Sequence, residues 1–348
     1  MNRELILTGP GAVAWRDAPE PTPAAGEVAV RCEHAAEKHG TMAAFVKGYG
    51  NERGRWDASR QLYQPGEGQL VDWPIPLGNM AVGTVVTVGP GVTRVAIGDR
   101  VVCYSQFRRL TVAPENKCWR IGADVPWQSA VCVDPGLFAL GAIRDGGVRL
   151  GDRVALFGLG AIGLVALQLL RAAGATVFAS DPVAERRALA LKLGAAATFG
   201  APGEDVGLLL KESTGRLGVD VALDFSGAVP ALQAALRGIA YGGTVVCGAF
   251  PPPHRQGLDL GGEAHLNRPR LVFSRANSEP NPEHPRWDQN RLLDTVVASI
   301  AAGVIDGRDI VSPVVDFRDC AEAYAMIAAA PGKGIKLGVD FTACRESR

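Results

Sequence analysis

The stretch from Arg153 to Asp181 constrains the fold of this chain more than any other part, because apolar runs in it flank a glycine-rich turn. Residues 154–157 form a short apolar run typical of a strand buried in a parallel sheet. Residues 164–173 keep an apolar helical pattern, which Gly174 ends. The apolar run 176–179 then leads to Asp181. The pattern predicts a strand, a turn, a helix and a second strand that ends at a carboxylate.

The turn in this segment consists of Gly158, Leu159, Gly160, Ala161, Ile162 and Gly163. In such a turn the first glycine permits a tight bend, the second lets the backbone approach a pyrophosphate, and the third lets the helix pack on the strand. The phosphates would lie at the helix N-terminus, where unpaired N–H groups and the helix dipole favour anions. These six residues are therefore predicted to bind a dinucleotide.

Asp181, the acid after the second strand, indicates which dinucleotide the turn would bind. A carboxylate about twenty residues after the glycines accepts hydrogen bonds from the ribose hydroxyls and repels a 2′-phosphate. Asp181 therefore predicts NAD rather than NADP, with Arg186 lying over the adenosine side. Two alternatives stay open: Asp181 caps a helix that starts at Pro182, and Arg186 is a solvated helical charge.

Composition excludes several classes of partner. Lys and Arg number 36, equal to the 36 Asp and Glu residues, and no basic run is interleaved with aromatic residues. Nucleic acid and membrane are therefore not expected as partners. Residues 1–11 lack the pattern of a signal peptide, and the seven cysteines include no C-x-x-C pair. We expect a cytoplasmic protein with reduced thiols.

The pattern along the 348 residues predicts two domains. The first hundred residues are rich in valine, glycine and proline, with short runs such as 84–88, which favours a small all-β unit. Beyond Leu150, strands alternate with helices, which predicts an α/β fold with a doubly wound parallel sheet. The expected strands are 154–157, 176–179, 219–224, 244–246, 271–273 and 335–341, and further helices are expected at 292–302 and 320–329.

The order of these parts resembles the medium-chain dehydrogenase/reductase superfamily, the zinc alcohol dehydrogenase-like group. His39-Gly40-Thr41 is similar to its C-G-T-D turn, residues 76–83 to its G-H-E block, and Asp134-Pro135 to the Glu-Pro of its polyol dehydrogenases. The resemblance implies a GroES-like β domain from residues 1–132 and 277–348, and a Rossmann domain from residues 133–276. It also implies a homodimer or homotetramer formed through the edge of the nucleotide-binding domain.

The chain departs from this family at the metal sites. The places of the three catalytic zinc ligands read His39, Asn79 and Asp134, and asparagine is a poor zinc ligand. The four-cysteine lobe for a structural zinc is absent, because Cys103 and Cys118 lie alone around a short connection. Residues 56–63 resemble a W-D-x-x-x-x-L-F/Y phrase found in a zinc-free subset of the superfamily. We therefore expect neither zinc.

Oxidation of an alcohol without a metal needs a group that accepts the hydroxyl proton. His39 is the first candidate for this general base, because the pKa of histidine lies near the working pH. The resemblance assigns Thr41 to substrate hydrogen bonding and proton relay, and Asn79 and Asp134 would orient the substrate. Alternatively, His39 only satisfies a turn, Thr41 caps a helix that starts at Met42, and Asp134 braces an interdomain helix.

Further cofactor contacts are expected at the strand ends, since ligands bind outside the carboxyl ends of parallel strands. Ser226, Gly248, Ala249 and Ser274 follow successive strands of the predicted sheet. Lys336 resembles the basic residue by which the C-terminal segment of the family meets the pyrophosphate, and the alternative is an exposed strand lysine.

These features predict an enzyme that transfers a hydride between NAD and a secondary alcohol or ketone without catalytic zinc. The polar candidates and Asp134-Pro135 favour a sugar-, cyclitol- or polyol-like small molecule as substrate. Two alternatives are a zinc-free enone or quinone reductase, which Asp181 disfavours, and a non-catalytic NAD-binding protein.

Overall fold

The computed structural model describes residues 2–48, 53–66, 71–278 and 281–345, without the side chains of 39, 41, 43, 44, 344 and 345. The chain forms two compact units. Unit 1 comprises Met1–Val131 and Val311–Arg348, and unit 2 comprises Cys132–Ile310. The first boundary lies within one residue of the one expected from the sequence.

The second boundary differs from the expectation, because residues 277–310 belong to unit 2 and not to the N-terminal part of the chain. Helix α9 (Gln289–Ala301) packs on helix α3 (Val133–Asp145), and both belong to unit 2. The packing is so close that a Cβ atom on Gly136 would come within 2.4 Å of the Val296 side chain. This helix pair fixes the segment to unit 2.

Unit 1 is built mainly of β-strands, as its valine-rich sequence predicts. Strands β3 (Glu27–Ala36) and β7 (Met80–Val88) pair antiparallel, and their inward-facing valines are buried. Strand β18 (Lys336–Asp340) pairs antiparallel with β3, so the C-terminal segment completes a sheet begun by the N-terminal one. The strand order is β10 (Cys118–Arg120), β8 (Arg100–Tyr104), β7, β3, β18 and β17 (Val311–Asp316), and β9 (Leu110–Pro114) also pairs with β3.

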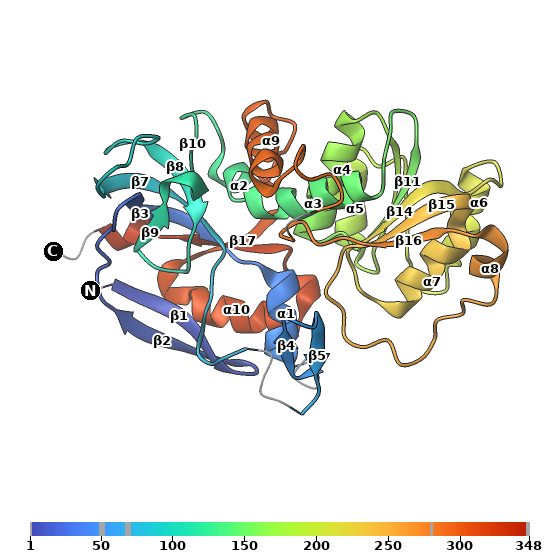
Figure 1. Cartoon of the computed structure of the whole chain (residues 1–348), viewed down its shortest axis with the longest axis horizontal. Coiled ribbons are helices and arrows are strands. Elements are labelled where there is room, and N and C mark those ends of the chain that lie inside the picture. Colours follow the sequence, from blue (N-terminus) through green and yellow to red (C-terminus); the bar gives the residue numbers. More distant parts are fainter. Residues whose placement is uncertain (1, 49–52, 67–70, 279–280, 346–348) are drawn as a thin grey trace. The chain divides into compact units, whose positions relative to one another are not determined.

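Helix α10 (Cys320–Ala329) belongs to unit 1 (Figure 1). One of its faces is buried in the core of that unit. Its Tyr324 and Ile327 lie in one cluster with Leu5 and Leu77. The other elements are the sheet β2 (Ala12–Ala18), β1 (Asn2–Gly9) and β6 (Ile75–Pro76), the hairpin β4 (Arg55–Asp57) and β5 (Leu62–Gln64), the helices α1 (His39–Lys47) and α2 (Trp127–Ala130), and the 3-10 turns Glu115–Lys117, Phe317–Asp319, Pro331–Lys333 and Thr342–Arg345.

The sheet of unit 2 is parallel, and its strand order confirms the predicted doubly wound fold. From β11 (Arg153–Phe157) the chain moves outward to one edge, then returns to pair β14 (Val219–Asp224) on the other side of β11. In sheets of this kind, ligands bind at such a reversal, so a ligand is expected outside the carboxyl ends of β11 and β14. The full order is β13 (Ala197–Phe199), β12 (Thr176–Ser180), β11, β14, β15 (Ile239–Cys247) and β16 (Arg270–Phe273).

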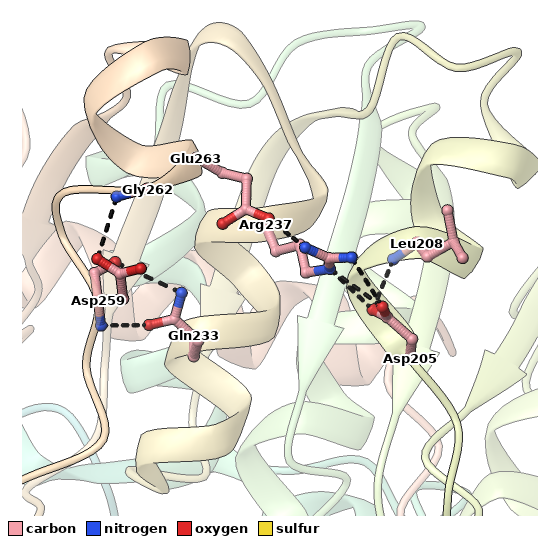
Figure 2. A network of polar contacts seen from close by, with 7 residues as sticks. All are labelled: Asp205, Leu208, Gln233, Arg237, Asp259, Gly262 and Glu263. Atoms are coloured by element: carbon pink, nitrogen blue, oxygen red, sulfur yellow. Dashed lines mark hydrogen bonds and ion pairs between the residues drawn. The ribbon is translucent and has the colours of Figure 1, made fainter.

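Helices flank this sheet, and three of them are joined by a polar network on the surface (Figure 2). Arg237 of α7 (Val229–Gly238) pairs with Asp205, which caps α6 (Val206–Ser213), and with Glu263 of α8 (Glu263–Asn267). The remaining helices are α4 (Ala161–Ala172) and α5 (Ala184–Lys192). Among the described residues, no helix is both long enough and apolar enough to cross a membrane.

Candidate functional site

The glycine turn of unit 2 has the geometry that its spacing predicts. Gly158 adopts φ +87°, and a Cβ atom on it would lie 2.7 Å from the Ser226 nitrogen. A Cβ atom on Gly163 would lie 2.0 Å from the Gly158 carbonyl oxygen, so only glycine lets the helix approach the turn this closely. A Cβ atom on Gly160 would meet no atom within 4 Å. The second glycine therefore faces open space, where a ligand can approach the backbone.

Helix α4 begins at this open position. Gly160 is its N-cap, and no described side chain makes a capping hydrogen bond there. The Leu164 N–H donates to the Gly160 carbonyl at 2.9 Å, so the N–H groups of Ala161, Ile162 and Gly163 precede the first intrahelical bond. These donors and the helix dipole form a site suited to a phosphate.

Asp181 lies beside the same turn and is 5% exposed. Its Oδ2 accepts a hydrogen bond from the Leu159 N–H at 2.8 Å, and its Oδ1 accepts one from the Val183 N–H at 2.9 Å. The capping alternative is wrong, because α5 begins at Ala184 with Val183 as its N-cap. Asp181 thus ties the end of β12 to the glycine turn.

Arg186 is held near this carboxylate. Its Nη1 lies 3.8 Å from Asp181 Oδ2, and only 17% of its side chain is exposed. The alternative of a solvated helical charge is therefore wrong. The Arg186 guanidinium therefore lies beside the Asp181 carboxylate, and its place over the adenosine side stays a prediction.

The carboxyl ends of β14, β15 and β16 bring further predicted residues together. Ser226 donates through its N–H and its Oγ to Asp224 Oδ1, at 2.8 and 2.6 Å. The Gly248 N–H donates to the Asp224 carbonyl at 2.9 Å, and the Ser274 N–H donates to the Cys247 carbonyl at 3.0 Å. Ala249 directly follows Gly248, so all four predicted contact residues lie at one edge of the sheet.

Asp224 lies beside these residues and was not singled out from the sequence. It is 3% exposed at the end of β14. Burial raises the pKa of its carboxyl, while the hydrogen bonds from Ser226 and Gly227 favour the ionised form. Its position in an apolar strand concealed it, although an acid at the carboxyl end of a buried strand is itself a signal of a site.

A hollow of about 120 Å³ lies elsewhere in unit 2, lined by the end of α3, the end of β16 and residues 275, 276, 278, 281–283, 287 and 292. Arg144 lines it and donates to both carboxylate oxygens of Glu283 at 2.6 and 2.8 Å. The Arg144 guanidinium also lies 3.6 Å from the centre of the Trp287 ring. Trp287 is thus packed against α3, and its cation contact explains why this segment belongs to unit 2.

Asn79 in unit 1 is held by a buried polar cluster. It is 9% exposed, and its Oδ1 lies 3.5 Å from the ammonium nitrogen of Lys336. Lys336 is 1% exposed and also donates to the Glu37 carbonyl oxygen at 2.6 Å. The alternative of an exposed strand lysine is therefore wrong. A contact between Lys336 and a pyrophosphate would require the ammonium to leave these partners.

Glu37 is the second residue that the sequence reasoning missed. Its carboxylate is buried, and it accepts from the Lys38 N–H at 2.7 Å and from the Gly78 N–H at 2.8 Å. Burial raises the pKa of Glu37, while the two N–H groups and the Lys336 charge favour its ionised form. Glu37 and Lys336 are 299 residues apart, so no local pattern could reveal their contact.

The remaining predicted catalytic residues divide between the units. His39 is the first residue of α1 in unit 1, and Thr41 lies within that helix, so the alternative of a cap before Met42 is wrong. The side chains of both lie outside the described part of the chain. Asp134 lies in the first turn of α3 in unit 2 and is 4% exposed.

Comparison with known proteins agrees with this geometry. Residues 24–143 match the family described as "Alcohol dehydrogenase GroES-like domain", and residues 161–284 match "Zinc-binding dehydrogenase". D-guloside 3-dehydrogenase of Escherichia coli (strain K12) is 38% identical in an alignment of 356 positions, which covers 97% of this chain and 100% of that protein. Probable D-xylulose reductase A of Aspergillus terreus is 26% identical, over 77% of this chain and 82% of that protein.

The fold is also that of a solved structure. A putative zinc-binding dehydrogenase from Sinorhizobium meliloti, bound to NADP, superposes with a TM-score of 0.78 at 21% identity, over 98% of this chain and 99% of that one. Its sequence identity is low, so this likeness speaks for the fold alone. With the full-length similarity to a curated dehydrogenase, the comparisons establish that the chain is an oxidoreductase of the medium-chain dehydrogenase/reductase superfamily, in its zinc alcohol dehydrogenase-like group.

Proposed function

We propose that this protein oxidises a secondary alcohol of a sugar-like molecule with NAD, and that it does so without a catalytic zinc. The proposed substrate class rests on the similarity to a D-guloside 3-dehydrogenase over the whole chain. The similarity to a probable D-xylulose reductase supports the same class. The substrate proposed is therefore a glycoside, cyclitol or polyol with several hydroxyl groups.

The residues of unit 2 fit a bound NAD. Gly160 leaves room for a pyrophosphate, and the open N–H groups of α4 would hold its oxygens. Asp181 would accept from the adenosine ribose hydroxyls and repel the 2′-phosphate of NADP. The residues at the ends of β14, β15 and β16, namely Ser226, Gly248, Ala249 and Ser274, would hold the nicotinamide half.

Oxidation removes a proton from the hydroxyl oxygen and a hydride from the carbinol carbon. When bound, NAD supplies the acceptor for the hydride. In the proposal, Thr41 hydrogen-bonds the substrate and relays the hydroxyl proton to the general base His39, while Asn79 and Asp134 orient the substrate. A neutral histidine near its usual pKa is suited to this task at neutral pH.

The donors at the zinc-ligand places do not fit a zinc ion. The Asn79 oxygen, which would be the second ligand, lies 3.5 Å from the Lys336 ammonium. A zinc ion on that oxygen would lie beside a buried positive charge, and carboxamides are weak zinc ligands in any case. This contact supports hydride transfer without a metal.

The cysteine chemistry supports the cytoplasm as the compartment in this proposal. Within the described part of the chain, no disulfide joins the cysteines at 32, 103, 118, 132, 247 and 320. Such a set of thiols persists in a reducing compartment.

The test of this proposal is steady-state NAD reduction by chelator-treated protein with a panel of glycosides, cyclitols, polyols and simple secondary alcohols. Turnover of a polyhydroxylated substrate, lost in His39→Ala and Thr41→Ala, is expected. Asp181→Ser should lower kcat/KM for NAD and raise it for NADP, with the thermal midpoint measured as the folding control. A wild-type preference for NADP, or activity that returns only with zinc, would contradict the proposal.

A further inference from the structure

The buried ammonium of Lys336 makes an unusual contact for a β-strand lysine. The strand β18 places it in the interior of unit 1, where it donates to the Glu37 carbonyl at 2.6 Å and faces Asn79 Oδ1 at 3.5 Å. A buried lysine is costly unless it is paired and hydrogen-bonded. The nearby Glu37 carboxylate, itself 1% exposed, supplies the opposite charge.

The Lys336 ammonium determines the orientation of the Asn79 carboxamide. A lysine ammonium only donates hydrogen bonds, so the atom that faces it must be the oxygen Oδ1. Rotating the carboxamide by half a turn would place its NH₂ group against the ammonium, donor against donor. The Nδ2 atom is therefore fixed on the side away from Lys336.

The Nδ2 group is available as a donor. Within the described ranges, Asn79 is recorded with one side-chain hydrogen bond, the one its Oδ1 accepts from Lys336. Asn79 as a whole is 9% exposed. Its NH₂ group is therefore the part of the side chain that the Lys336 contact leaves for another partner.

The backbone around Asn79 is fixed by the same cluster. The Gly78 N–H donates to the Glu37 carboxylate at 2.8 Å, and Gly78 adopts φ +118°, which other residues rarely adopt. A Cβ atom on Gly78 would lie 2.5 Å from the Phe107 nitrogen. Glu37 therefore holds Lys336 through its carbonyl and the turn before Asn79 through its carboxylate.

We propose that Lys336 is a positioning residue, which orients the Asn79 carboxamide so that its NH₂ group donates a hydrogen bond to the reacting oxygen of the substrate. This inference rests on the proposed function. It names the group that stabilises negative charge on the reacting oxygen. In the direction of ketone reduction, the carbonyl oxygen gains negative charge as hydride arrives, and a fixed N–H donor stabilises that charge. Asn79 is then a donor where the zinc enzymes of the superfamily have a metal ligand.

The experiment compares variants that separate the donor role of Asn79 from its contact with Lys336. Asn79→Asp is isosteric and keeps an acceptor for the ammonium, so its thermal midpoint should stay near that of wild type. It loses both N–H donors, so its kcat should fall by about 10²–10³-fold, the loss typical of removing one oxyanion donor. Wild-type turnover in Asn79→Asp would overturn the inference.

Lys336→Met tests the positioning role. It should lower kcat with the chosen substrate while the Kd for NAD, measured by quenching of tryptophan fluorescence, stays within about twofold of wild type. In the double variant with Asn79→Asp the two losses should not add, because both act through the same group. A weaker NAD affinity with unchanged kcat at saturating NAD would instead assign Lys336 to the pyrophosphate. Should Lys336→Met fail to fold, the same measurements on Lys336→Gln and Asn79→Asp test the positioning role.

A readout independent of turnover separates this inference from the proposed function. In the folded full-length protein, the NMR signals of the Asn79 side-chain NH₂ group, assigned by their loss in Asn79→Asp, should exchange with water and show no contact to the Lys336 methylene next to the ammonium. Strong contacts between them would overturn the inference. A wild-type protein inactive on every substrate would defeat only the proposed function.

Discussion

At the residue scale, the three glycines of the turn do different physical work. Gly158 is needed for its positive φ, Gly163 for its contact with the Gly158 carbonyl, and Gly160 only for the space it leaves. The first two requirements belong to the folded chain itself. The third arises only when a ligand is present, so substitution at Gly160 and at Gly163 should affect different properties.

Gly163→Ala should lower stability by about 1–3 kcal/mol, because its new methyl group would overlap the Gly158 carbonyl oxygen. Gly160→Ala should change stability by less than about 0.5 kcal/mol, because its φ of −77° suits alanine and its Cβ meets no atom. It should raise the Kd for NAD at least about tenfold, which is about 1.4 kcal/mol. Denaturant unfolding and NAD titration measure both, and unchanged NAD affinity in Gly160→Ala would contradict the site.

Cys247 offers a second test at this scale. Burial, and then the charge of Asp224, raise the pKa of its thiol to about 11. Since the thiolate is the reactive form, its alkylation rate should keep rising about tenfold per pH unit from pH 7 to pH 10. The rate is measured by treating the protein with iodoacetamide and following the alkylated Cys247 peptide by mass spectrometry. A plateau near pH 8.5 would show that the thiol is not perturbed.

At the element scale, unit 2 depends on contacts between helices as well as on its sheet. Arg237 joins α6, α7 and α8, because it pairs with Asp205 and with Glu263 (Figure 2). Its partner Asp205 has a lowered pKa, first because of the Arg237 hydrogen bonds and then because of the Leu208 N–H. These side chains are about half exposed, so the network contributes modestly.

Arg237→Met should therefore destabilise the protein by at most about 1 kcal/mol at pH 6. A carboxyl with a lowered folded pKa contributes stability above its unfolded pKa and loses it as the pH falls through the folded value. The difference in thermal midpoint between wild type and Arg237→Met should thus shrink below about pH 4. Arg308→Met is the control, because its pair with Asp306 joins no separate elements. An equal difference at pH 6 and pH 3 would refute the electrostatic account.

Across the whole molecule, elements with local sequence signals could be predicted, and contacts between distant residues could not. The glycine turn, the strands 154–157, 176–179 and 219–224, and the helix α10 were predictable because their signals are local. Strand β13, with three residues, was missed, since so short a run carries no period. The Glu37–Lys336–Asn79 cluster could not be predicted, because topology alone brings its members together.

The edge of the nucleotide-binding sheet should determine the oligomeric state. Strand β16 ends the order of the sheet, and its Leu271 and Phe273 are 42% and 79% exposed. An open apolar edge invites pairing with a second copy. Light scattering should give a multiple of 36.5 kDa for wild type and 36.5 kDa for Phe273→Lys. A wild-type monomer would contradict this expectation.

The central claim is direct hydride transfer from a sugar-like secondary alcohol to NAD without a metal. The most direct measurement uses chelator-treated protein with its zinc content determined, and a glycoside that the panel finds active, deuterated at each ring carbon in turn. The account predicts that deuterium from one carbinol carbon arrives at C4 of the nicotinamide while the zinc content stays far below one per chain. Transfer only in zinc-loaded protein, or product formation without deuterium in the reduced cofactor, would contradict it.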